Sequence, residues 1–158
     1  METATVAALK KELQFYSKDD LMQVCLRLAK FKKENKELLS YLLFESENEQ
    51  HYIDGIKEEI DEAFASMNTS SFYYSKKSVR KILSNTKKYI RYSQNKETEV
   101  QLLLYFCRKL RTMTPSFTRS SVLRNTYETQ LRMIRKAMEK LHEDLQYDYQ
   151  RELEKLES

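Results

Sequence analysis

The chain has 158 residues, with one glycine, one proline and a formal net charge of +4 at pH 7. Strand-rich folds and phosphate-cradling loops need these two residues for positive-φ corners and chain reversals, so their scarcity excludes a P-loop and a GxGxxG turn. The 41% hydrophobic content, with 11 Tyr and 7 Phe, excludes a disordered chain. We therefore predict an all-α protein.

The first third of the chain has apolar residues at the 3.6-residue period of helices. The predicted helices cover about 3–15, 18–32 and 36–46. Ser17 and Asp20 form a short version of a capping box before the second helix, and Asn35 is the expected N-cap of the third. Because its leucines occur almost all round, we expect the third helix to be central and buried.

Two further helices, at about 48–67 and 76–93, surround the polar loop 68–71. Gly55 lies inside the first of them and costs about 1 kcal/mol relative to alanine, which either close helix packing or simple tolerance explains. The outer face of this helix is acidic. Ser75 is the expected N-cap of the second helix.

The helix at 76–93 collects cations on one side of its helical wheel. Residues 69–124 contain 13 basic residues, against only Glu97 and Glu99. A basic helix flanked by tyrosines suits nucleic acid or another acidic partner. Two simpler interpretations are ion pairing with the acidic helix 48–67 and a solvated face of little energetic weight. The candidate partner surface consists of Lys76, Lys77, Arg80, Lys81, Lys87, Lys88 and Arg91.

The last helices are predicted at about 96–112 and 117–156, separated by Thr114-Pro115 as an N-cap with N1 proline or as a helix stop. Apolar residues follow a heptad spacing from Tyr127 onward. A 40-residue helix spans about 60 Å, more than a compact domain of this size, so it either overhangs and self-associates, packs along its own domain, or breaks near Asp148. The candidate self-association seam consists of Leu141, Leu145, Tyr149, Leu153 and Leu156.

Similar patterns 58 residues apart, beginning at Tyr16 and Tyr74, suggest two three-helix units within one domain covering 1–158. The units would occupy about 16–67 and 74–156. We expect six to seven helices in a bundle or a short right-handed stack similar in architecture to armadillo or HEAT proteins, with a long C-terminal helix.

No complete catalytic set occurs in the chain. His51 and His142 are the only histidines, and Glu139 with His142 is half of a di-iron pattern whose other half is missing. Cys25 and Cys107 lie in apolar stretches and are expected to be buried and reduced. We predict no enzymatic activity, no cofactor and no metal.

Membrane insertion is not expected, because the longest apolar run has six residues and no targeting segment is apparent. We expect a cytoplasmic location. The function that we favour is a non-enzymatic interaction or scaffold module that binds a protein partner or a second copy of itself. The alternative is a nucleic-acid-binding protein that uses the basic face of helix 76–93.

Overall fold

The computed structural model describes residues 1–158 and confirms the all-α prediction. It contains eight α-helices, one more than the upper number expected, with a π-helical segment at Tyr41–Glu45, a 3-10 turn at Phe117–Arg119 and no strand. None of the helices combines the length and apolar character needed to cross a membrane. The chain divides into two compact units, Met1–Phe44 and Glu45–Ser158. This boundary lies well before the loop 68–71, where the two repeated units were expected to separate.

The first unit contains α1 (Val6–Leu13), α2 (Lys18–Phe31) and α3 (Lys33–Ser40). Ser17 caps α2 as predicted, since its hydroxyl accepts the Asp20 N–H at 3.1 Å. The prediction that Asn35 caps the third helix is wrong. Asn35 lies in the first turn of α3, and its side-chain amide donates to the Leu28 carbonyl of α2 at 2.7 Å. Asn35 therefore ties the two helices together at their turn.

The expectation of a central, buried third helix is also wrong. No residue of α3 is buried, and Leu38, Leu42 and Leu43 are exposed in α3 and the π-helical segment after it. Leucines all round a helix indicate burial only if neighbours surround it. Within the first unit, α2 is the helix that packs against α3, and one neighbour covers one side.

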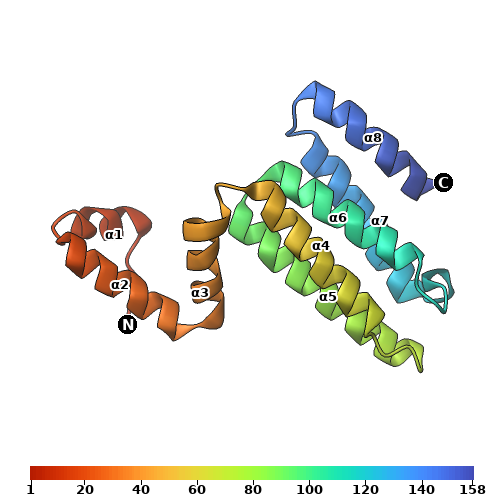
Figure 1. Ribbon diagram of the computed structural model, residues 1–158, viewed down its shortest axis with the longest axis horizontal. Helices are drawn as coiled ribbons and strands as arrows, with labels where there is room; N and C mark the ends of the chain where they lie inside the picture. The colour runs from red at the N-terminus through yellow and green to blue at the C-terminus, as the bar shows by residue number, and fades with distance from the viewer. The chain divides into compact units, whose positions relative to one another are not determined.

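The second unit is built around α6 (Lys96–Arg111). The hairpin of α4 (Glu49–Ala65) and α5 (Phe72–Ser93) packs against α6. The next two helices, α7 (Ser121–Met138) and α8 (Glu143–Glu157), also contact α6, as Figure 1 shows for these five helices. Fully buried side chains of α6 form the middle of this core: Val100, Leu102, Leu103, Leu104, Phe106, Cys107 and Leu110.

Two helix starts in this unit differ from the prediction. Helix α5 begins at Phe72 and is capped by Ser71, whereas Ser75, the predicted cap, is buried inside the helix. Helix α7 begins at Ser121 after an N-cap at Ser120, so Pro115 does not open it. Hydroxyl side chains are frequent before both helices, and the sequence alone does not decide which of them accepts the first free N–H groups.

The prediction of one long C-terminal helix is wrong as well. The chain breaks after Met138, earlier than the proposed break at Asp148, and α8 starts at Glu143 with His142 as its N-cap. The side-chain amide of Gln146 donates to the Leu141 carbonyl at 2.8 Å and stabilises the turn. The break lets α8 fold back, which buries Leu153 and Leu156. A straight helix would leave these two side chains in water.

Candidate interaction surfaces

The basic residues of α5 do not form a single exposed face. Lys77, Arg80, Lys81 and Arg91 are exposed, and Lys76 and Lys88 are half-buried. Lys87 points inward, with its ammonium 3.3 Å from the Met133 sulfur of α7. Burial lowers the pKa of Lys87, and the nearby Glu99 carboxylate opposes this shift. Lys87 therefore belongs to the contact between α5 and α7.

The outer carboxylates of the acidic helix beside α5 do not form close ion pairs with most of the α5 cations. Its outer carboxylates, Glu58, Glu59 and Glu62, make no ion pair with any of five α5 cations, namely Lys76, Lys77, Arg80, Lys81 and Arg91. An ion pair between α4 and a neighbouring helix joins Asp61 to Lys109 of α6 at 3.2 Å. Direct ion pairing between these three carboxylates and these five cations is therefore absent.

Exposed aromatic rings lie at the start of α5, next to these cations. The rings of Tyr73 and Tyr74 meet edge to face with centroids 5.3 Å apart, and both side chains are exposed. The Lys77 ammonium lies over the Tyr73 ring, 4.9 Å from its centroid. A cation stacked on an exposed ring is a combination that nucleic-acid-binding surfaces use.

The predicted self-association seam is occupied within the chain. Leu153 and Leu156 are buried, and Leu141, Leu145 and Tyr149 are half-buried. The Tyr149 hydroxyl donates to the Glu97 carboxylate of α6 at 2.7 Å, and burial together with this bond raises the pKa of Tyr149. These side chains hold α8 against the core.

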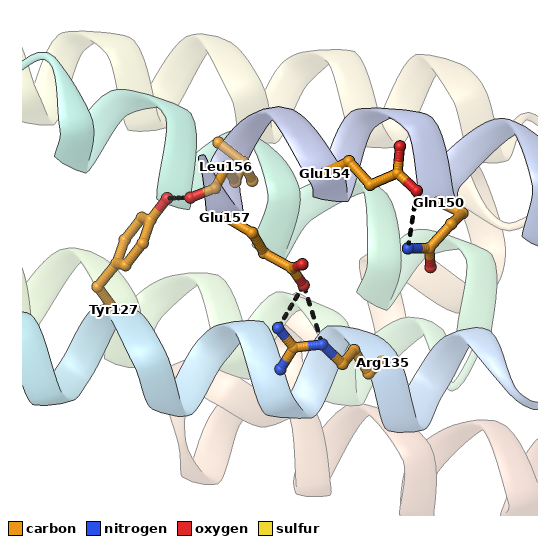
Figure 2. Close-up of polar contacts among 6 residues, drawn as sticks. All are labelled: Tyr127, Arg135, Gln150, Glu154, Leu156 and Glu157. Atoms are coloured by element: carbon orange, nitrogen blue, oxygen red, sulfur yellow. Dashed lines mark hydrogen bonds and ion pairs between the residues drawn. The ribbon is translucent and has the colours of Figure 1, made fainter.

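Polar contacts fix the end of α8 to α7 (Figure 2). The Tyr127 hydroxyl donates to the Leu156 carbonyl at 2.5 Å, and the Arg135 guanidinium pairs with the Glu157 carboxylate. A depression of about 470 Å³ lies beside these contacts and also includes Arg124 and Glu128. Its lining carries charges of both signs, and it contains neither a histidine nor a cysteine.

The histidines and cysteines do not assemble into a reactive centre. His51 Nδ1 lies 3.4 Å from Glu45, and His142 accepts the Asp144 N–H at 3.2 Å as a helix cap. No three His, Cys, Asp or Glu side chains gather in a way that would hold a metal ion. Cys107 is buried, and burial raises its pKa to about 12, so it behaves as a small hydrophobe. Cys25 is exposed, contrary to the prediction.

The most extensive apolar surface, which the sequence analysis missed, lies on residues 1–44. All but three of the exposed large hydrophobic side chains of the protein belong to this segment, and the three exceptions are tyrosines. Phe15, Phe31 and Phe44 are 80%, 77% and 78% exposed, and in the whole segment only Ala29 and Tyr41 are buried. We call this set of exposed side chains the N-terminal apolar surface. Periodicity located the helices correctly but gave no information on whether a neighbour covers them.

Comparison with known proteins gives no further guide: no protein-family model, no curated protein and no solved structure matches the chain.

Proposed function

We propose that the protein is a non-enzymatic interaction module whose contact surface is the N-terminal apolar surface. One observation carries this proposal: residues 1–44 leave most of their large apolar side chains in water. Exposed contiguous apolar patches on a protein usually mark interaction sites. The second unit, α4–α8, acts in this proposal as a compact helical bundle that carries the interacting segment.

The size of the first unit supports the same conclusion. Units near 40 residues rarely bury enough surface to be stable without a disulfide, a metal or a partner. Both cysteines are free thiols, and no metal-binding group of side chains is present. Of the disulfide, the metal and the partner, we therefore favour a binding partner as the source of stability for this unit.

A fluorescent probe of apolar surface tests the proposal in the full-length protein. At nanomolar concentration, where association is minimal, we expect the probe to bind the native chain. The double variant Leu28→Glu/Phe31→Glu should bind several-fold less, because both side chains are exposed parts of the surface. The control is Gln23→Glu, which adds a negative charge at an exposed polar residue of the same helix that is not part of the apolar surface, and it should leave binding unchanged. Equal probe binding by the native chain and the double variant would contradict the proposal.

A second candidate function, nucleic-acid binding through α5, is supported by exposed α5 cations that make no ion pair with Glu58, Glu59 or Glu62 of α4. Lys77, Arg80, Lys81 and Arg91 are the residues that would meet phosphates, and Tyr73 and Tyr74 are those that would stack on bases. Counterion release makes such binding weaken steeply as salt rises.

Titration of a labelled duplex and a labelled single strand at two salt concentrations tests this second candidate. The expected result is micromolar binding that falls with salt and is strongly reduced in Arg80→Glu/Lys81→Glu. Lys10→Glu/Lys11→Glu in α1 is the matched change of charge. Absence of binding at low salt, or an equal loss in both variants, would exclude a specific role for α5.

A further inference from the structure

Aromatic and basic side chains from two separate elements meet where α5 begins. Tyr73 and Tyr74 lie in the first turn of α5, and both side chains are exposed. The Arg119 guanidinium, from the 3-10 turn before α7, lies over the Phe72 ring, 5.8 Å from its centroid. Figure 1 shows the connection between α6 and α7 at the same end of the second unit as the start of α5. The fold therefore brings a cation that is distant in the sequence to the aromatic residues of α5.

The cations at this end flank Tyr73 on two sides. At 100° for each residue, counted from Phe72 on the helical wheel, Tyr73 lies at about 100°, Arg80 at about 80° and Lys77 at about 140°. Tyr73, Lys77 and Arg80 also have the i, i+4, i+7 spacing that places residues on one face of a helix. Arg119 lies on the other side of Tyr73, against the ring of Phe72.

No ion pair within the chain occupies these cations. Lys77, Arg80 and Arg119 are exposed, and none of them is paired with a carboxylate. No Asp or Glu occurs between Glu62 and Glu97 in the sequence. Each of the three side chains is therefore available to neutralise a phosphate and release its counterion.

The exposed tyrosines favour a single strand over a duplex. The bases of a duplex are paired and stacked on one another, whereas an unpaired base offers its flat face to an aromatic side chain. Tyr73 is 59% exposed and Tyr74 is 47% exposed, which leaves ring surface for such a base. We propose that this end of α5 binds single-stranded nucleic acid, with unpaired bases stacked on Tyr73 and Tyr74.

The phosphates beside the stacked bases bind Lys77, Arg80 and Arg119. This inference rests on the second candidate function, which names nucleic acid and leaves the form of the strand open. Arg91 lies at about 100° on the same wheel, the angle of Tyr73, and about 27 Å further along the helix. Single-strand sites in proteins cover about 4–16 nucleotides, so a strand of about 12 nucleotides is a suitable probe.

A strand with bases and an abasic strand of the same length separate stacking from charge. We expect the full-length native protein to bind the strand with bases at least about fivefold more tightly, because base stacking on an aromatic ring contributes a factor of this order. Tyr73→Leu/Tyr74→Leu should bind the two strands equally. The matched control, Tyr16→Leu/Tyr147→Leu, changes two other exposed tyrosines and should keep the native ratio. Equal binding of the two strands by the native protein would overturn the stacking.

A reversal of charge tests the contribution of the 3-10 turn. Arg119→Glu should weaken binding of the single strand by roughly tenfold and make it less dependent on salt, because a phosphate contact is lost. Lys136→Glu makes the same change at an exposed cation in the last turn of α7, and it should weaken binding by less than about threefold. Equal losses in the two variants would mean that only net charge matters and would overturn the role of Arg119.

A duplex and a polyglutamate peptide complete the experiment, because cations also bind these two ligands. Either one bound as tightly as the single strand at the same salt concentration would overturn the single-strand inference. The second candidate function still stands if the duplex binds in a salt-dependent way and Arg80→Glu/Lys81→Glu weakens that binding. Absence of nucleic-acid binding at low salt would overturn both, whereas the apolar probe tests the N-terminal apolar surface independently.

Discussion

At the residue scale, Gly55 lowers the stability of α4 relative to alanine without making room for a close contact. A Cβ added at this position would meet no atom within 4 Å, and the residue is exposed inside α4. Of the two explanations offered by the sequence, close packing is therefore wrong and simple tolerance remains. Alanine at this position keeps the helix and restricts the unfolded chain.

Gly55→Ala is therefore expected to raise the free energy of unfolding by about 0.5–1 kcal/mol. Urea denaturation followed by circular dichroism measures the change. The control is Glu58→Ala, on the solvent side of the same helix, for which we expect a change within about 0.5 kcal/mol. A loss of stability in Gly55→Ala would mean that the glycine serves a contact after all.

A second residue-scale prediction concerns pH and the bond between α4 and α6. The Tyr105 hydroxyl donates to the Asp61 carboxylate at 2.6 Å, and the Lys109 ammonium lies 3.2 Å from the same oxygen. These donors, Tyr105 first, lower the pKa of Asp61 below its ordinary 3.8. Burial and the bond to Asp61 raise the pKa of Tyr105 to about 12.

Because folded Asp61 binds its proton more weakly than unfolded Asp61, its contribution is present above the unfolded pKa and disappears as pH falls through the folded pKa. Asp61→Asn should therefore be less stable than the native chain at about pH 6, and the difference should shrink below about pH 3.8. Glu58→Gln, which has no ion pair in this region, is the control. Denaturation curves across this range measure the effect, and a difference that grows in acid would contradict it.

At the element scale, the positions of the helices were largely predictable and their surroundings were not. The spacing of apolar residues predicted the ends of α2, α4 and α6 closely. An amphipathic helix has apolar residues at the helical period along the side that it buries, so its position can be read from the sequence. The cap of α2 at Ser17 followed from the same local chemistry. The break between α7 and α8 did not, since no glycine or proline marks it and its cause is the distant burial of Leu153 and Leu156.

The folding back of α8 predicts that its last turns contribute to stability. Leu153 is fully buried, so Leu153→Ala should reduce the free energy of unfolding by about 2–5 kcal/mol through lost burial and a residual cavity. Tyr147 is on the solvent side of the same helix, and Tyr147→Ala should cost less than about 0.5 kcal/mol. If both substitutions have the same small effect, α8 does not pack on the core as observed.

At the scale of the whole molecule, the two units differ in how well they bury their apolar residues. Helix α6 alone contributes seven fully buried apolar side chains, whereas residues 1–44 bury only Ala29 and Tyr41. Sequence patterns could not reveal this difference, because an apolar helix face looks the same whether its partner lies in the same chain or in another. The seam on α8, which one of the three interpretations left exposed for self-association, packs on the core, while Leu38, Leu42 and Leu43 were predicted to be buried and are exposed.

The central claim is that residues 1–44 present an apolar interaction surface, and binding of a fluorescent apolar probe to the full-length protein tests it most directly. At nanomolar concentration the native chain should bind the probe, because residues 1–44 leave most of their large apolar side chains exposed. Leu28→Glu/Phe31→Glu should bind several-fold less, and Gln23→Glu should keep the native value. A native chain that binds no probe, or a double variant that binds as much as the native chain, would contradict the account.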